Sequence, residues 1–176
     1  ENTSDKFRTA FVELKNEMNQ VLESFVIVQR STIAGDIVQF ADDKVKRVCV
    51  GRYDKNLDGE LTYEEIATVT DLTNLFLLEK NITSFDELEY FTSVTEIPYE
   101  LFKNCEKLVS VKLPEGIKVI GSSAFDNCKS LKEIEIPEGI EGYFEYEFSA
   151  SGIGSYCFSG CSSLEKVVLP STLRAL

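Results

Sequence analysis

The sequence contains no histidine, and this absence excludes several classes of chemistry. Ser-His-Asp and Cys-His nucleophile systems, histidine-ligated zinc and the usual proton shuttle near neutral pH all require an imidazole. Carboxylate pairs could still transfer protons, but with 30 acidic side chains in 176 residues many pairs arise by accident. We therefore predict that the protein is not an enzyme.

Long apolar runs and positive charge are also scarce. No segment approaches the roughly 20 apolar residues that a membrane-spanning helix needs. The 18 basic side chains leave a net charge of −12, and such a surface repels phosphate backbones and anionic lipid. We therefore expect neither nucleic acid nor membrane insertion, whereas the acidity suits cation binding.

A repeat is the strongest pattern in the second half of the chain. Seven positions recur after 23 residues, and six of these recur after a further 33. The copies are Phe102, Cys105, Leu108, Val111, Leu113, Pro114 and Gly116, then Phe125, Cys128, Leu131, Ile134, Ile136, Pro137 and Gly139, then Phe158, Cys161, Leu164, Val167, Leu169 and Pro170. Such spacing is typical of short strands that face a core and end at proline. One unit cannot bury its apolar face alone, so we predict stacked parallel strands over a continuous core.

The outward positions of these strands carry charges of opposite sign in neighbouring copies. The expected neighbours are Lys112 and Glu135, Lys132 and Glu165, and Glu133 and Lys166. Opposite charges on adjacent strands attract weakly, so this face should be nearly neutral.

The cysteines follow the repeat. Cys105, Cys128 and Cys161 occupy one column, and Cys157 replaces the core-facing Ala124. We predict buried thiols that fill the interior. A disulfide framework is the alternative, because an exported protein could oxidise its five cysteines.

Residues 54–65 match the twelve-residue calcium loop of an EF-hand. The predicted ligands are the side chains of Asp54, Asn56, Asp58, Thr62 (or a water that it holds) and Glu65, and the backbone carbonyl of Glu60. Gly59 allows the left-handed turn that the loop needs, and helices are expected at 42–53 and 63–71. The alternative is a plain capping box from Thr62 to Glu65 in a turn-rich loop.

The amino-terminal segment carries an apolar stripe with spacings of four, three, four, three and four. Its members are Phe7, Phe11, Leu14, Met18, Val21 and Phe25. This heptad spacing predicts one helix that packs against the calcium-loop helices, with dimerisation as the alternative. We therefore expect a helical module at 1–80 and repeats at 81–176.

The third copy is preceded by ten residues more than the repeat requires. This insertion holds Tyr143, Phe144, Tyr146 and Phe148. Insertions in stacked repeats leave as loops on one face, and exposed aromatic rings can stack on sugars or fill protein pockets. We predict that the segment packs against the outer wall of the stack, with a ligand-binding loop formed by these four residues as the alternative.

The units Phe102–Pro114, Phe125–Pro137 and Phe158–Pro170 resemble the BspA-like leucine-rich-repeat proteins of bacterial cell surfaces. The segment at 82–92 and the calcium loop resemble the regions that precede the first repeat in that family. The resemblance implies an α+β fold that ends in a right-handed leucine-rich-repeat solenoid with a short parallel sheet. It also implies export or attachment to the outer cell surface and, for some members, adhesion to host proteins.

Together these features predict a non-enzymatic binding or adhesion module. It would recognise a protein or a glycan and be stabilised by a structural Ca²⁺ ion. The alternative is a spacer or cap within a larger surface protein, with no ligand of its own.

Overall fold

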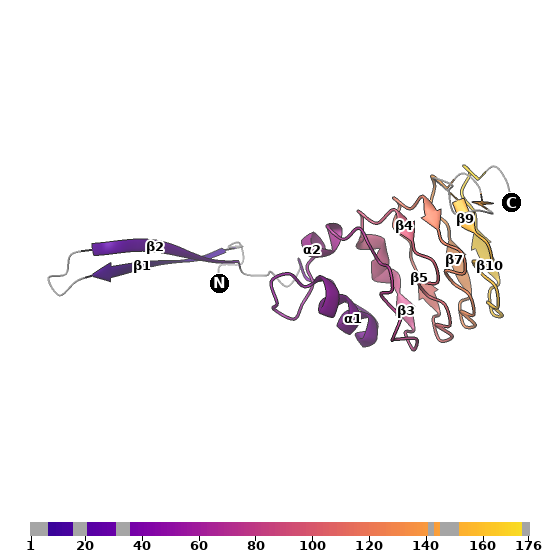
Figure 1. Ribbon diagram of the computed structural model, residues 1–176, viewed down its shortest axis with the longest axis horizontal. Helices are drawn as coiled ribbons and strands as arrows, with labels where there is room; N and C mark the ends of the chain where they lie inside the picture. Colours follow the sequence, from indigo (N-terminus) through magenta and orange to yellow (C-terminus); the bar gives the residue numbers. More distant parts are fainter. Residues whose placement is uncertain (1–6, 16–20, 31–35, 141–142, 145–151, 174–176) are drawn as a thin grey trace. The chain divides into compact units, whose positions relative to one another are not determined.

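The computed structural model describes residues 7–15, 21–30, 36–140, 143–144 and 152–173 (Figure 1). For the strands at 7–15, 21–30 and 143–144, only the backbone is described. The chain divides into two compact units, Glu1–Ile37 and Val38–Leu176.

The first unit contains an antiparallel hairpin of β1 (Phe7–Lys15) and β2 (Val21–Arg30). The helix predicted for this segment is therefore wrong, and the helical module does not begin at residue 1. Residues 25–28 read Phe-Val-Ile-Val, and aromatic and β-branched residues favour strands over helices. In the hairpin this run pairs with β1, where Phe11 lies opposite Val26 and Val12 opposite Phe25.

The second unit begins with two helices on either side of the predicted calcium loop. Helix α1 (Asp43–Tyr53) is capped by Asp42, and α2 (Tyr63–Ala67) is capped by Thr62. The prediction of a helix after the loop is correct, but α2 ends earlier than expected. Two β-branched residues at 68 and 69 follow it, and such side chains lose rotamer freedom in a helix. No helix of the described residues is long and apolar enough to cross a membrane.

Short parallel strands follow in two series. The first series contains β3 (Ser84–Phe85), β5 (Ser110–Val111), β7 (Glu133–Glu135) and β10 (Lys166–Val168). Within it β3 pairs with β5, and β7 pairs with β10. The second series contains β4 (Glu96–Ile97), β6 (Val119–Ile120), β9 (Gly152–Gly154) and β8 (Tyr143–Phe144), paired in that order. Figure 1 shows these strands as successive rungs, which confirms the predicted parallel stacking.

One further turn precedes the three copies found in the sequence. Phe85 of β3 lies beside Val111 of β5, and the Phe76 ring stacks on Phe102 with centroids 5.6 Å apart. The two turns are offset by 26 residues instead of 23, and the 3-10 helix η2 (Asp86–Tyr90) follows β3. Because of this different offset, alignment of the 23-residue copies in the sequence did not reveal the additional turn.

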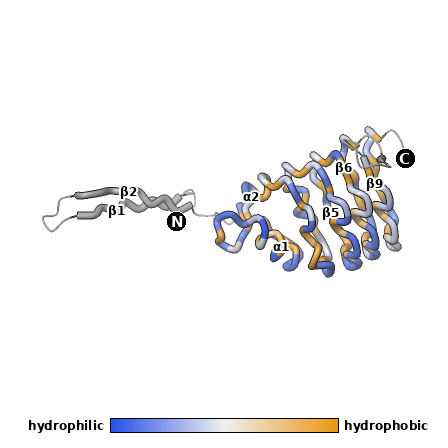
Figure 2. The backbone as a smooth tube through the Cα atoms, in the orientation of Figure 1, coloured by the Kyte–Doolittle hydropathy of each residue, from blue (hydrophilic) through white to orange (hydrophobic). Residues whose placement is uncertain are grey.

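Identical side chains form columns inside the stack. The rings of Phe102 and Phe125 stack with centroids 5.0 Å apart, and those of Phe125 and Phe158 with centroids 5.4 Å apart. Offset stacking of this kind adds to the stabilisation from burial alone. Apolar (orange) and polar (blue) stretches alternate along each turn in Figure 2, as the repeat pattern requires.

The same core includes side chains from α1 and α2. Val45, Cys49 and Ile66 are fully buried in one cluster with Leu108 and Leu131. The two helices and the repeats therefore form one compact unit. The division falls after Ile37, whereas the sequence led us to expect a boundary near residue 80.

A third ladder joins the turns that precede each Leu-x-x-Val strand. The backbone N–H groups of Glu100, Phe102 and Asn104 donate to the carbonyls of Ser122, Ala124 and Asp126. Those of Ser123, Phe125 and Asn127 donate in the same way to Ser155, Cys157 and Ser159. Asn104, Asn127 and Gly160 have φ between 61° and 70°, a region that asparagine and glycine tolerate best. This conformation explains the asparagine of the repeat motif.

Candidate functional site

The loop at 54–65 is organised around the Asp54 carboxylate. Its oxygens accept hydrogen bonds from the backbone N–H of Leu57 at 2.7 Å and of Gly59 at 2.9 Å. Leu57 and Gly59 have positive φ, and Gly59, at 84°, supplies the predicted left-handed turn. Leu61 is fully buried, and its carbonyl accepts a hydrogen bond from the Val38 N–H at 2.8 Å. The loop is thus fixed to the core at one point and exposed at its tip.

Three predicted ligands lie together at that tip. The Asp58 N–H donates to Asn56 Oδ1 at 2.9 Å, and Asn56 Nδ2 donates to Asp58 Oδ2 at 3.0 Å. The Glu60 N–H donates to Asp58 Oδ1 at 2.9 Å, while the Glu60 carboxylate pairs with Lys46. This pairing leaves the Glu60 carbonyl as the group assigned to the ion.

The remaining two predicted ligands form the capping box. Glu65 Oε2 accepts from the N–H and the hydroxyl of Thr62, both at 2.9 Å, and Thr62 Oγ1 accepts from the Glu65 N–H. Glu65 Oε1 accepts from the Lys55 N–H at 3.3 Å, across the loop. The capping box that we considered as the alternative is therefore present, in a loop where Gly59 also has the positive φ that the calcium-loop pattern predicts.

The predicted ligands are chemically suited to calcium, since every one of them is an oxygen atom. Within the described residues, however, no group of three or more Cys, Asp or Glu side chains is placed to hold a metal. Both carboxylate oxygens of Glu65 accept hydrogen bonds, one from Lys55 and the other from Thr62. Bidentate coordination would require Glu65 to exchange these bonds for the ion.

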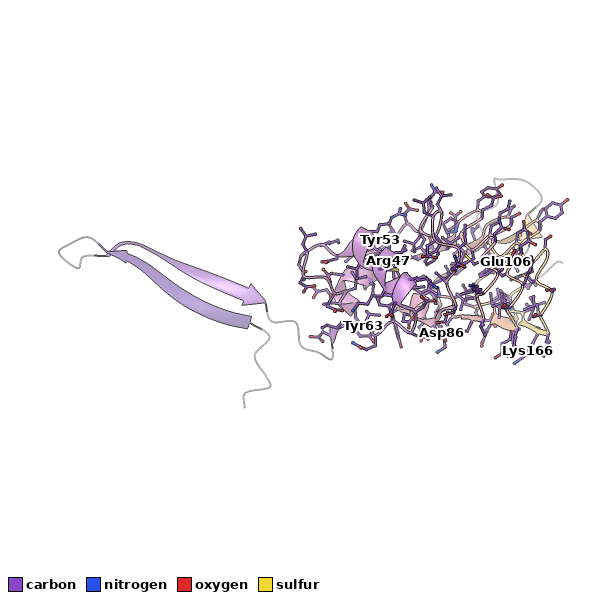
Figure 3. The ribbon with its side chains drawn as sticks, turned by 90° about the horizontal axis from the view of Figure 1, so that it is seen from below. Arg47, Tyr53, Tyr63, Asp86, Glu106 and Lys166 are labelled. Atoms are coloured by element: carbon purple, nitrogen blue, oxygen red, sulfur yellow. The ribbon has the colours of Figure 1, made fainter. Side chains whose placement is uncertain are left out.

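The structure contains a second candidate site, which the sequence analysis did not identify. The rings of Tyr63 and Tyr90 meet edge to face, with centroids 5.0 Å apart, and each side chain is a little over one third exposed. Next to them Lys112 Nζ lies 3.3 Å from Glu89 Oε1. The negative charge of Glu89, together with partial burial and a hydrogen bond to Glu89, raises the pKa of the Tyr90 hydroxyl. We call these four residues the tyrosine patch; Tyr63 is labelled in Figure 3.

No short-range pattern predicts the tyrosine patch. Tyr63 is the first residue of α2, Tyr90 is the last residue of η2, and Lys112 follows β5. The fold brings these three elements together, so only a tertiary contact could reveal the site.

Of the three pairs of opposite charges predicted for the strand face, one forms an ion pair among the described residues. Lys166 lies opposite Glu133, with Nζ 3.6 Å from Oε2, as predicted. Lys112 differs, because it turns to Glu89 on the preceding turn and pairs there instead of with Glu135. Lys129 adds a pair with Glu106 at 2.7 Å; Glu106 and Lys166 are labelled in Figure 3.

All five cysteines are free, which agrees with the predicted buried thiols. Cys128 Sγ donates to the Phe102 carbonyl at 3.2 Å, and Cys161 Sγ donates to the Phe125 carbonyl at 3.1 Å. Burial raises the pKa of the Cys105 thiol to about 11. The Cys128 and Cys161 thiols therefore link consecutive turns, and the Cys105 thiol remains protonated at neutral pH.

The aromatic insertion is largely outside the described residues. Tyr143 and Phe144 form β8, which lies parallel to β9 with Tyr143 opposite Ile153. Their side chains are not described, and Tyr146 and Phe148 lie outside the described residues altogether. Both predictions for this insertion, packing against the stack and ligand binding, stay predictions.

The stacked parallel strands, with their columns of Phe, Cys and Leu, define a leucine-rich-repeat protein. The chain belongs to the family described as the BspA type leucine rich repeat region, whose pattern matches residues 76–176 in six copies. No curated protein and no solved structure matches the chain. The family is typical of protein-interaction modules and of bacterial surface proteins, and it is generally non-enzymatic.

Proposed function

We propose that this protein is a secreted or cell-surface adhesion module that binds another protein without catalysing a reaction. The tyrosine patch is the observation that carries the proposal. It offers two partly exposed aromatic rings beside an accessible Lys112–Glu89 pair. Tyrosine is enriched in protein interfaces because it supplies a large, rigid contact area together with a polar hydroxyl.

The surrounding surface favours a protein over a highly charged ligand. Opposite charges, such as those of Lys166 and Glu133, leave little net charge on the strand face. A partner with mixed charges can align with such a surface, whereas a polyanion finds no continuous positive field. A glycan that stacks on the tyrosines, or on the aromatic insertion at Tyr143, Phe144, Tyr146 and Phe148, is the second candidate ligand.

We further propose that the repeats form a right-handed solenoid and that a structural Ca²⁺ ion stiffens the loop at its start. Leu61, in the middle of the loop, is fully buried in the common core, and this supports a stabilising role for the ion. A conformational switch would need a second loop, and the sequence offers only one match to the calcium-loop pattern. The alternative role, a spacer without a ligand, predicts no binding by either aromatic site.

The test is a binding screen of the whole chain against extracellular-matrix proteins and a glycan array, with and without calcium. We expect saturable binding to a protein, and the double variant Y63S/Y90S should weaken it by roughly 30-fold, as for a residue pair that contributes about 2 kcal/mol. Y99S is the matched control, because Tyr99 is 64% exposed but lies outside the tyrosine patch. Equal affinities for both variants would refute the assignment, and no binding at all would favour the spacer.

A further inference from the structure

Residues 71–81 run antiparallel to α1 along one of its sides. Four side chains of α1 donate hydrogen bonds to this segment, and the order of donors and acceptors along the chain is reversed. The donor and acceptor residues are Tyr53 with Asp71, Arg52 with Thr73, Arg47 with Glu79 and Lys44 with Asn81, at 2.6–2.8 Å. The helix and the segment therefore form one continuous surface.

Two leucines of this segment are exposed on that surface. Phe76 is fully buried, but Leu77 is 61% and Leu78 is 96% exposed. In the later turns the two residues after the stacked phenylalanine are polar or glycine, namely Lys103-Asn104, Asp126-Asn127 and Ser159-Gly160. Of these four turns only the first carries an apolar pair at this place, and burial in the core does not account for it.

Leu77 and Leu78 line an open hollow of about 390 Å³ beside α1. Its lining also includes Arg47 and Val48 of α1 and Glu79 of the segment. We call it the leucine hollow. Its volume falls within the roughly 300–1,000 Å³ that is typical of binding pockets.

Gly51 leaves the helix surface beside the leucine hollow without a side chain. It lies one turn after Arg47 and Val48, on the same face of α1. Glycine weakens the interior of a helix relative to alanine, and a Cβ at this position would meet no atom within 4 Å. Packing among the described residues therefore does not require glycine here, whereas a partner that lies along α1 gains from the missing side chain.

The charges around the leucine hollow favour an acidic partner. Helix α1 carries four basic side chains and one acidic side chain, in a protein whose net charge is −12. Arg47, labelled in Figure 3, pairs with Glu79, but its side chain is 68% exposed against 19% for Glu79. The guanidinium is therefore the charged group that a partner meets, and a carboxylate can bind it through two parallel hydrogen bonds.

The surface distinguishes among possible occupants. The backbone groups in the interior of a helix are paired with each other, so α1 offers no edge to which a strand could add. An amphipathic helix instead places apolar side chains at i, i+3, i+4 and i+7 into such a groove. Two copies of this chain, each with a net charge of −12, repel each other, and the same charge repels an anionic lipid surface.

We propose that the leucine hollow binds an acidic amphipathic helix of a partner protein. Apolar side chains of the partner pack on Val48, Leu77 and Leu78, and one of its carboxylates pairs with Arg47. The partner helix lies along α1 and passes over Gly51. This surface shares no residue with the tyrosine patch, and the proposal stands whether or not that patch binds a protein.

The probe is a fluorescein-labelled synthetic helix with leucines at i, i+3, i+4 and i+7 and with glutamate and alanine elsewhere, titrated into the whole chain. We expect saturable binding by fluorescence anisotropy. L78S should weaken it at least about tenfold, because an apolar contact at the centre of the interface is lost. L57S is the matched control, since Leu57 is 86% exposed but lies in the loop at 54–65, and it should bind as the unaltered chain does.

Two further variants test the helix surface and the charge. G51Q should weaken binding at least about fivefold without lowering Tm, because the new side chain obstructs the surface of α1 but suits a helix better than glycine. R47Q should weaken binding roughly threefold or more and reduce its dependence on salt. K166Q, which removes an exposed ion pair with Glu133 elsewhere on the molecule, should do neither.

No binding of the probe, or equal binding by L78S and L57S, would overturn the proposal, as would unaltered affinity in G51Q or R47Q. Equal binding of a second peptide with lysine in place of glutamate would also overturn it, because the partner would then not need to be acidic. The double variant Y63S/Y90S should bind the probe normally, so failure of the proposed function leaves this result unaffected.

Two other occupants are tested directly. If vesicles of phosphatidylcholine and phosphatidylglycerol bind the chain but not L78S, a lipid surface is the occupant and the proposal is overturned. If sedimentation equilibrium shows a dimer that L78S abolishes, a second copy is the occupant, with the same consequence. We expect a monomer and no sedimentation with vesicles.

Discussion

Asp42 joins α1 to the first turn of the repeats. Its carboxylate caps α1 through the Lys44 N–H at 2.8 Å and accepts from the N–H and hydroxyl of Thr83 at 2.6 and 2.7 Å. Burial by itself raises the pKa of Asp42, but the hydrogen bonds from Thr83 and from the start of α1 outweigh it and lower the pKa. The ionised form is therefore bound more tightly in the folded than in the unfolded protein.

We predict that D42N lowers the free energy of unfolding by about 1–3 kcal/mol at pH 7, because the charged acceptor of four hydrogen bonds from Lys44, Val45 and Thr83 is lost. Since the folded pKa lies below the unfolded value of about 3.9, the contribution of Asp42 is complete above that pH and disappears as the pH falls through the folded pKa. Urea unfolding between pH 3 and 7 measures the difference. D43N is the control, and a difference for D42N that did not depend on pH would contradict this assignment.

The cysteines should differ in reactivity according to their burial. Burial raises the pKa of all five thiols, and to about 11 for Cys105. Cys161, the least buried, should react first with iodoacetamide at pH 8, and the other four should react appreciably only in denaturant. Mass spectrometry of timed samples tests this order, which rapid modification of Cys49 or Cys128 in the folded protein would contradict.

At the scale of elements, the calcium loop makes a prediction about melting. An ion that binds the folded loop stabilises it by about 2.7 kcal/mol at one hundred times its dissociation constant, which corresponds to a rise of roughly 5 °C or more in Tm. We expect this rise between chelator and millimolar calcium, and its loss in D54N. E64Q is the matched control, since Glu64 lies in α2 beside Glu65 but outside the predicted ligand set. Identical melting curves with and without calcium would remove the site.

The aromatic insertion can be tested as a separate element. Replacing Tyr143, Phe144, Tyr146 and Phe148 with Ser should abolish capture of a glycan or protein ligand and leave the Tm within about 2 °C, if the loop binds. Loss of the cooperative unfolding transition would show instead that the rings pack against the stack. Differential scanning calorimetry alongside the binding screen distinguishes the two results.

For the molecule as a whole, the sequence predicts the features that follow from the repeat. Phe102, Phe125 and Phe158 share a column because residues at equal offsets occupy equal places in successive turns. The match to the calcium-loop pattern also came from sequence, since its twelve residues are contiguous, and ion binding there stays a prediction. Its turns are as expected, but Glu65 had two compatible roles, and the structure gives it the capping box.

The remaining features depend on contacts or on competing local preferences. In the amino-terminal segment the spacing of Phe7, Phe11 and Leu14 suits a helix, but the β-branched run at 25–28 favours a strand, and the hairpin results. Tyr63 and Tyr90 are far apart in sequence and meet only after the fold forms. Lys112 could reach a neighbour on either side, and spacing alone does not decide between Glu89 and Glu135.

The one-way ladder of amide groups in the turns has a consequence for how the molecule loses its structure. Since the amides of Phe102 and Phe125 are held by the residues that come after them, each layer is secured by its successor. Loss of a later turn should therefore release these amides in the turn before it, and faster hydrogen exchange at Phe102 or Phe125 should report that loss.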